Sequence, residues 1–192
     1  MTRLLIVTAA AMALAACQDE PSAPTANGDG IVNAVASVSP TSPPQRFALT
    51  GAKGEPHGSV TISESAGGIN IAVAATGLSP GVHGIHLHET GACAGPKFDS
   101  AGKHWNPAAK QHGRDNPNGA HLGDLVNLTV DANGSAKTSF PMAGASMAGG
   151  AMTLADADGT ALVIHAKADD YRTDPSGDSG DRIVCAVLAA GK

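Results

Sequence analysis

The sequence predicts an all-β protein, and three observations lead to this fold class. Short apolar segments recur from about residue 46 to residue 188, and Gly, Pro or Ser residues separate them. Two consecutive segments, Ser59–Ser63 and Asn70–Ala74, alternate polar and apolar residues, as antiparallel strands with one buried face do. About eight such segments fit one β-sandwich or flattened barrel, and a region of about 145 residues is long enough to bury its own core.

The expected strands are distributed evenly along this region. Ala66-Gly67-Gly68 suits a hairpin turn between the second and the third strand, and Asp131–Gly134 is a turn signal between the fifth and the sixth. In chain order the eight expected strands are Arg46–Thr50, Gly58–Glu64, Ile69–Ala75, Gly84–His88, Leu125–Val130, Ala136–Phe140, Ala161–His165 and Ile183–Leu188.

Two long segments interrupt the pattern of strands, Glu89–Leu122 and Ala166–Asp181. Both are rich in Gly, Pro, Asp and Lys. Long loops without regular structure are uncommon in a compact domain, and they are usually functional. We therefore expect the functional residues to lie in and beside these two loops.

The N-terminus has the pattern of an export signal. Arg3 supplies a positive charge, and Leu4–Ala16 form a thirteen-residue apolar run that is too short to span a membrane. The ending Leu14-Ala15-Ala16-Cys17 is similar to the lipobox of bacterial lipoproteins, in which the cysteine is lipidated; an ordinary signal peptide with an incidental Cys17 is the alternative. We expect a signal peptide at residues 1–16 and a lipid anchor at Cys17, which would hold the protein at a membrane of the bacterial cell envelope or periplasm.

The next segment, residues 17–45, is expected to be a flexible tether, with the folded domain at residues 46–192. The tether combines five prolines with Ser, Ala, Thr, Gly and Asn, and little in it can be buried. Removal of residues 1–16 removes one base, Arg3, and no acid. Eleven bases then oppose seventeen acids, so the mature net charge is −6. This balance argues against nucleic acid as a partner.

The most informative stretch places His86 and His88 beside the apolar residues Ile85 and Leu87. Side chains alternate between the two faces of a strand, so both imidazoles leave on one face while Ile85 and Leu87 point to the other. Two imidazoles side by side on a strand make half of a transition-metal site, of a kind that suits copper, zinc or nickel. Alone, such a pair is a weak signal, because it also arises by chance.

Further histidines and one aspartate strengthen the prediction of a metal site. The chain has eight histidines. His83 is expected to be a hydrogen-bonded structural residue on the other face, and His57 has no assigned role. Seven candidate ligands are too many for one tetrahedral ion and one short of the number for two four-coordinate ions, so one residue would be shared. The seven candidates are His86, His88, His104, His112, His121, Asp124 and His165.

This set of candidates resembles the copper/zinc superoxide dismutases. His104, His112 and His121 fall eight and nine residues apart, as in that family, and a His-x-x-Asp motif closes the set at Asp124. The resemblance covers roughly residues 46–190. The motifs that carry it are Gly81–His88, Ser100–Pro107, His121–Leu125 and Gly180–Cys185.

The resemblance implies a fold, a reaction and two cofactors. The fold would be an eight-stranded antiparallel Greek-key β-sandwich or flattened barrel with two long functional loops. The reaction would be the dismutation of superoxide to dioxygen and hydrogen peroxide by a redox-cycling copper ion next to a structural zinc ion. By this resemblance copper is held by His86, His88, His104 and His165, and zinc by His104, His112, His121 and Asp124.

The resemblance also implies roles for residues around the metals. Asp169 would link ligands of the two metals by hydrogen bonds, with an ordinary loop acid as the alternative. Arg182 would guide the anion to copper, with a plain surface arginine as the alternative, and it shares the catalytic role with His104. Cys93 and Cys185 would form a disulfide in an oxidising compartment, with two free thiols as the alternative.

Two competing functions come from other classes. A copper-handling or zinc-buffering module of the same fold would not turn over superoxide, but inactive domains of this kind typically lose a copper ligand or the arginine, and this chain keeps both. A structural adhesion-type sandwich does not explain six histidines in register. Whether the domain is a monomer or a homodimer stays open.

Overall fold

The computed structural model describes residues 40–192. The signal peptide expected at residues 1–16, the lipidation expected at Cys17 and the tether as far as residue 39 lie outside the described residues. In the part of the chain that is described, no helix is long and apolar enough to cross a membrane.

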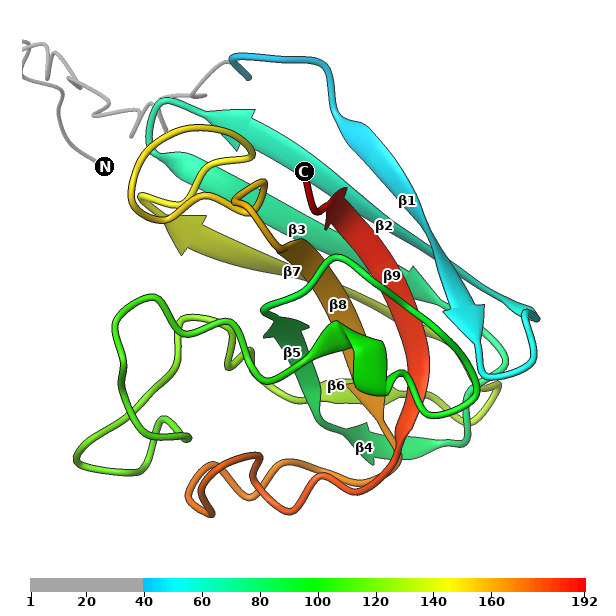
Figure 1. The fold of residues 1–192 in the computed structure, drawn as a ribbon. Helices are drawn as coiled ribbons and strands as arrows, with labels where there is room; N and C mark the ends of the chain where they lie inside the picture. Colours follow the sequence, from blue (N-terminus) through cyan, green and yellow to red (C-terminus); the bar gives the residue numbers. More distant parts are fainter. Residues whose placement is uncertain (1–39) are drawn as a thin grey trace, which may run out of the picture. The chain divides into compact units, whose positions relative to one another are not determined.

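Strands dominate residues 40–192 (Figure 1). Within this range a single short 3-10 helix, η1 (Asp99–Ala101), interrupts the first long loop. The strands are β1 (Gln45–Gly51), β2 (Pro56–Ser65), β3 (Gly68–Ala75), β4 (Gly81–His83), β5 (Ile85–His88), β6 (Leu128–Val130), β7 (Ala136–Ala143), β8 (Gly159–His165) and β9 (Arg182–Ala190).

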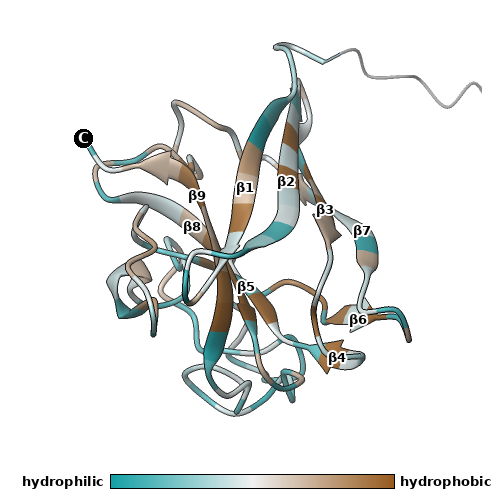
Figure 2. Cartoon of the chain, turned by 90° about the vertical axis from the view of Figure 1, so that its right-hand side faces the viewer, coloured by the Kyte–Doolittle hydropathy of each residue, from teal (hydrophilic) through white to brown (hydrophobic). Residues whose placement is uncertain are grey.

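Seven of these strands form one antiparallel sheet in the order β5-β8-β9-β1-β2-β3-β7, and β4 pairs with β6 in a second, two-stranded sheet. The larger sheet curls, so that β8 and β9 lie across the molecule from β3 and β7 (Figure 2). The predicted all-β, antiparallel fold is therefore confirmed. The expected turns are present as well, because Ser65 pairs with Gly68 and the Gly134 N–H donates to the Asp131 carbonyl oxygen.

The strand bounds differ from the prediction at two places beside the metal-ligand candidates. Gly84 is not in a strand: its N–H donates to the Lys167 carbonyl oxygen, and its carbonyl oxygen accepts from the His165 N–H. The chain therefore changes sheets between β4 and β5. Strand β6 begins only at Leu128, because the Asn127 N–H donates to the Tyr171 hydroxyl group instead of a strand neighbour. Residues 144–158 form a third long connection, which the sequence analysis did not predict.

The core lies between the two halves of the curled sheet. Val60 and Ile62 of β2 are buried, and β3 alternates buried and half-buried residues from Ile69 to Ala75, as expected. Each buried aliphatic side chain of this kind contributes roughly 1.5–3 kcal/mol relative to an exposed one. Strand β8 is buried along its whole length. It therefore forms a rigid support for the metal-ligand candidates at its end and on β5.

Strand β5 lies at the edge of the larger sheet, and loop residues cover its free side. The Leu87 N–H donates to the Gly123 carbonyl oxygen at 2.9 Å, and the Leu87 carbonyl oxygen accepts from the Trp105 N–H at 2.7 Å. This pairing satisfies an edge that would otherwise expose unpaired backbone groups. It also brings ligand candidates together, since isolated bridges pair His86 with Asp124 and His88 with His104.

A disulfide joins Cys93 of the first long loop to Cys185 of β9, with their Cα atoms 5.8 Å apart. The predicted pairing is confirmed. The two cysteines are 92 residues apart, and on the chain-entropy model closing such a loop contributes about 4–5 kcal/mol. Phe98 and Ala101 pack against Cys185 in a small cluster of their own. The disulfide therefore holds the segment around η1 against the sheet.

Candidate metal centre

Four buried histidines converge on one point in the structure. Strand β5 presents two of them on one face, while its Ile85 and Leu87 side chains enter the core, as the alternation predicted. The others come from the end of β8 and from the loop segment that pairs with β5. One side-chain nitrogen from each residue lies within 4.8 Å of the others. The group consists of His86, His88, His104 and His165.

A second group lies next to the first and shares His104 with it. Its other members are His112, His121 and Asp124. Asp124 Oδ1 lies 2.8 Å from His104 Nδ1 and 3.1 Å from Nδ1 of both His112 and His121. Three imidazoles and one carboxylate oxygen are a ligand set suited to a tetrahedral zinc ion.

The unpartnered polar atoms show that these residues fit metal ions. Within residues 40–192, five buried side-chain nitrogens lack a hydrogen-bond partner, and all five belong to the two groups. Buried polar atoms without partners are rare and costly in folded proteins, so a set of five that converge fits the binding of cations. Four belong to the first group, namely His86 Nδ1, His88 Nε2, His104 Nε2 and His165 Nε2; the fifth is His112 Nδ1.

Burial keeps the four histidines of the first group neutral and able to bind a cation. It lowers the pKa of His104 to about 4 and that of His165 to about 3. It also lowers the pKa of His86, and that of His88 falls well below its ordinary value. A neutral imidazole keeps a lone pair for a metal, whereas a protonated one has none.

The second group has a different electrostatic character, because two carboxylates face it. Although burial alone would lower it, the neighbouring carboxylates of Asp124 and Asp169 raise the pKa of His112 to about 9. The pKa of Asp124 is held far below its usual range, since its contacts with the His104 and His112 imidazoles outweigh its burial. The Asp124 carboxylate is thus fully ionised at neutral pH. Such a site favours a divalent cation, which on binding would displace the proton of His112.

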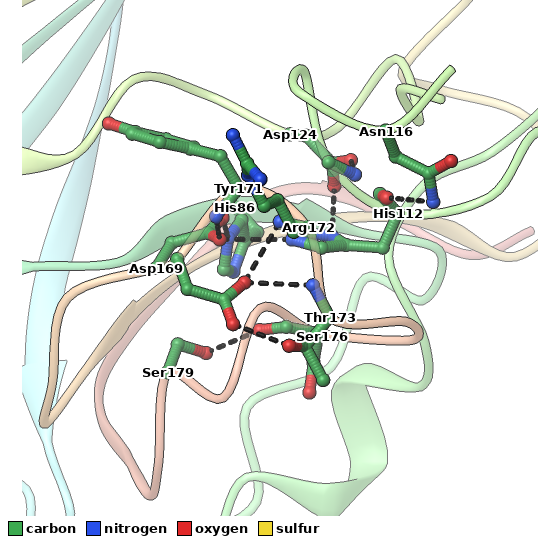
Figure 3. Close-up of polar contacts among 12 residues, drawn as sticks. His86, His112, Asn116, Asp124, Asp169, Tyr171, Arg172, Thr173, Ser176 and Ser179 are labelled. Atoms are coloured by element: carbon green, nitrogen blue, oxygen red, sulfur yellow. Dashed lines mark hydrogen bonds and ion pairs between the residues drawn. The ribbon is translucent and has the colours of Figure 1, made fainter. Parts of the chain in front are cut away.

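Asp169 joins the two groups by a hydrogen bond to one histidine of each (Figure 3). Its Oδ2 accepts a hydrogen bond from His86 Nε2 at 2.8 Å, and its Oδ1 accepts one from His112 Nε2 at 3.0 Å. These contacts leave Nδ1 of each imidazole directed away from Asp169, and both Nδ1 atoms are unpartnered. The structure thus brings Asp169 to the position that the resemblance implies.

Arg182 lies beside the first group, because it is the cross-strand neighbour of His165 in the β8–β9 pairing. Its guanidinium group donates to the carbonyl oxygens of Phe98 and Gly102, both at 2.7 Å. The Gly102 oxygen also accepts from His88 Nδ1 at 3.0 Å. Arg182 and His88 are therefore fixed to one peptide group. These two carbonyl groups could not be predicted from the sequence, since no side-chain motif signals a backbone acceptor.

The two remaining histidines lie outside both groups. His83 is buried, with Nδ1 2.7 Å from the His165 carbonyl oxygen and Nε2 2.9 Å from that of Ser79. It is the hydrogen-bonded structural residue that was predicted. His57 Nδ1 lies 2.8 Å from the Thr76 carbonyl oxygen. Asn127, which no sequence motif marks as part of the site, hydrogen-bonds to the backbone of Asp169.

Comparison with known proteins identifies the family. The family model described as copper/zinc superoxide dismutase (SODC) matches residues 56–188. The chain belongs to the copper/zinc superoxide dismutase family. A relative from Caulobacter vibrioides, named as a Cu-Zn superoxide dismutase, is 41% identical over 138 residues, which cover 70% of this chain and 79% of that one. The superoxide dismutase-like protein YojM of Bacillus subtilis is 43% identical over 143 residues, 73% of each chain.

Solved structures of the family agree with the fold. The crystal structure of a superoxide dismutase-like protein from Bacillus subtilis has a TM-score of 0.72 and 42% identity, covering 74% of this chain and 97% of that one. The copper/zinc superoxide dismutase of Brucella abortus has a TM-score of 0.60 and 30% identity, covering 76% and 99%. As a family member the chain is an oxidoreductase whose cofactors are copper and zinc, and the two groups of ligands have the residue types that these ions need.

Proposed function

We propose that this protein catalyses the dismutation of superoxide, with copper at the four-histidine group and zinc at the group that contains Asp124. The observation that carries the proposal is the convergence of four unpartnered imidazole nitrogens beside Arg182. The reaction converts two superoxide anions and two protons to one dioxygen and one hydrogen peroxide. Copper, when bound, supplies the one-electron redox chemistry of this reaction, and zinc supplies a fixed positive charge and holds its loop.

The residues of the chain supply binding, orientation and a proton position. His104 offers Nε2 to the copper group and Nδ1 to the zinc group. Its Nε2 is the atom at which this residue would hold and release a proton for hydrogen peroxide. Asp169 fixes the ring orientations of His86 and His112, a task that outer hydrogen bonds commonly perform in metal sites. The protein thus positions both cofactors before substrate arrives.

The proposal is tested by measuring metal content and dismutation together on the folded domain. We expect one copper and one zinc per chain and a superoxide dismutation rate that is lost when copper is removed. A module that stores copper or zinc without turnover is the second candidate. Full metal loading with no dismutation above that of the free buffer would favour this second function and reject the first.

We expect Arg182→Glu to lower the dismutation rate at least about ten-fold, because a focused positive field in a cleft raises association rates roughly 10- to 1000-fold. The substrate is an anion and the chain carries a net charge of −5, so only a local positive charge attracts it. The slowing caused by added salt should weaken or reverse, since salt would then screen repulsion. The measurement is the rate as a function of ionic strength.

Lys137→Glu is the matched control for this change. Lys137 is exposed on β7, at the edge of the larger sheet opposite β5, and its replacement changes the net charge by the same amount. A wild-type rate and salt dependence in Arg182→Glu would make Arg182 a bystander. An equal loss in both variants would assign the effect to net charge instead of to position.

We further propose that the protein is held at a membrane of the bacterial cell envelope by a lipid on Cys17. The support is the apolar run that ends in Leu14-Ala15-Ala16-Cys17. We expect Cys17→Ser to be exported as a soluble protein with unchanged specific activity, because Cys17 precedes the β-domain. One acyl chain binds a membrane only marginally and several hold firmly. Fractionation after a salt wash checks this, and a variant still firmly membrane-bound would reject the anchor.

A further inference from the structure

Asn127 holds the backbone of Asp169 through two reciprocal hydrogen bonds. Its side-chain Oδ1 accepts from the Asp169 N–H, and its Nδ2 donates to the Asp169 carbonyl oxygen, both at 2.9 Å. The carboxamide makes the two hydrogen bonds that a neighbouring strand would otherwise make, because it satisfies both the N–H and the carbonyl oxygen of one residue. The second long loop is thus attached to the start of β6 at the residue that contacts both ligand groups.

Tyr171 hydrogen-bonds to both Asn127 and Asp169. Its hydroxyl oxygen accepts from the Asn127 N–H at 2.8 Å, and its own N–H donates to Asp169 Oδ1 at 2.6 Å. The Arg114 guanidinium carbon lies 5.6 Å from the centre of the Tyr171 ring, which ties the first long loop to the same point. Asp169 is therefore fixed at its N–H, its carbonyl oxygen and its carboxylate.

Gly177 lies closely against the Asp169 carboxylate. A Cβ atom placed on Gly177 would overlap Asp169 Oδ1 and would lie 2.7 Å from His112 Nε2. The same carboxylate must reach His86 Nε2 and His112 Nε2 at 2.8 and 3.0 Å. A shift of the Asp169 backbone of a few tenths of an ångström would therefore lengthen one of these bonds or meet Gly177.

We propose that Asn127 is a positioning residue which, through Asp169, sets the orientation of one imidazole in each metal group. This inference rests on the proposed function of the two groups as copper and zinc sites. The hydrogen bonds of Asn127 found within residues 40–192 go to Asp169 and Tyr171 and not to a ligand of either group, so its effect is expected to pass through the Asp169 carboxylate. Loss of its side chain should disturb metal binding at His86 and at His112 together while leaving the ligands in place.

The test measures the zinc dissociation constant of the metal-depleted protein by chelator competition. We expect Asn127→Leu to weaken zinc binding about 10- to 100-fold, the range found when groups behind metal ligands are removed. Asn127→Asp keeps the acceptor and loses the donor, so it should fall between Asn127→Leu and wild type. The control is Asn70→Leu, at a half-buried position on β3 with no side-chain hydrogen bond found within residues 40–192. Unchanged zinc affinity in Asn127→Leu and Asn127→Asp would overturn the proposal.

A double-mutant cycle with Asp169→Ala separates positioning from simple loop attachment. In Asp169→Ala the backbone bonds to Asn127 can still form, but the carboxylate that transmits their effect is gone. We expect Asn127→Leu to change zinc affinity less than about three-fold in this background, because the two residues act in series. An undiminished 10- to 100-fold loss would show that Asn127 only anchors the loop, and would reject the proposal. The electron paramagnetic resonance spectrum of Cu²⁺ added to Asn127→Leu should also differ from wild type. These readouts require no turnover, so they stay informative if the dismutation assay fails.

Discussion

Replacement of His165 by alanine should abolish dismutation while zinc stays bound and most of the stability is kept. His165 belongs to the four-histidine group and not to the group around Asp124. Its Nε2 is buried and unpartnered, and its Nδ1 lies 3.2 Å from the Gly180 carbonyl oxygen. Loss of a residue that only hydrogen-bonds to a metal ligand lowers metal affinity about 10- to 100-fold. Loss of a ligand itself should therefore weaken copper binding more than about 100-fold.

The measurement for His165→Ala is copper and zinc content after dialysis against a weak chelator, together with the dismutation rate. His57→Ala is the control, since His57 lies outside both ligand groups and its side chain contacts Thr76 and Glu55. Copper retained in His165→Ala at wild-type stoichiometry and affinity would reject the assignment of His165 as a ligand. Loss of zinc along with copper would instead indicate that the two groups do not bind independently.

The sequence predicted the parts of the site that depend on side-chain type and strand alternation. His86 and His88 share a face because their neighbours Ile85 and Leu87 are apolar and enter the core. Asp124 follows His121 by three residues, so its carboxylate accepts the His121 N–H at 3.0 Å within the same turn. Local geometry determines both features, and a single sequence carries local geometry well.

Features that depend on backbone groups or on distant contacts could not be predicted in this way. The strand is interrupted at Gly84 because the backbones of Lys167 and His165, about 80 residues away, hydrogen-bond to its N–H and carbonyl groups. Asn127 lies in a strand-like segment, and nothing in its local sequence signals a support for Asp169. Tertiary contacts override the local pattern at both positions, and both adjoin the ligand groups.

The disulfide and the first long loop together fix the position of the Arg182 side chain. Cys93 and Cys185 fix the loop to β9, three residues after Arg182. The loop then presents the carbonyl oxygens of Phe98 and Gly102 to the guanidinium group. The long Arg182 side chain is thereby held in one conformation, so its charge acts at a defined point beside the four-histidine group.

Asp124→Ala should lose zinc, loosen the segment Glu89–Leu122 and lower the melting temperature, while copper ligands remain. Asp124 Oδ1 faces three imidazoles, and Oδ2 accepts from the N–H groups of Gly113 and His121 at 2.9 and 3.0 Å. Removing one partner of such a buried ionic cluster costs about 3–5 kcal/mol. For a chain of this size that corresponds to a fall of about 6–20 °C in the melting temperature of the metal-free protein.

Asp131→Ala is the matched control for Asp124→Ala, because Asp131 also accepts two backbone N–H groups, those of Asn133 and Ser135, but lies in an exposed turn away from both ligand groups. It should keep zinc and lose little stability. Hydrogen exchange should show faster exchange within Glu89–Leu122 in Asp124→Ala alone. Zinc bound at wild-type affinity in Asp124→Ala would exclude this carboxylate as a ligand. An equal loss of stability in both variants would assign the stability effect of Asp124 to its backbone hydrogen bonds instead of to the imidazole cluster.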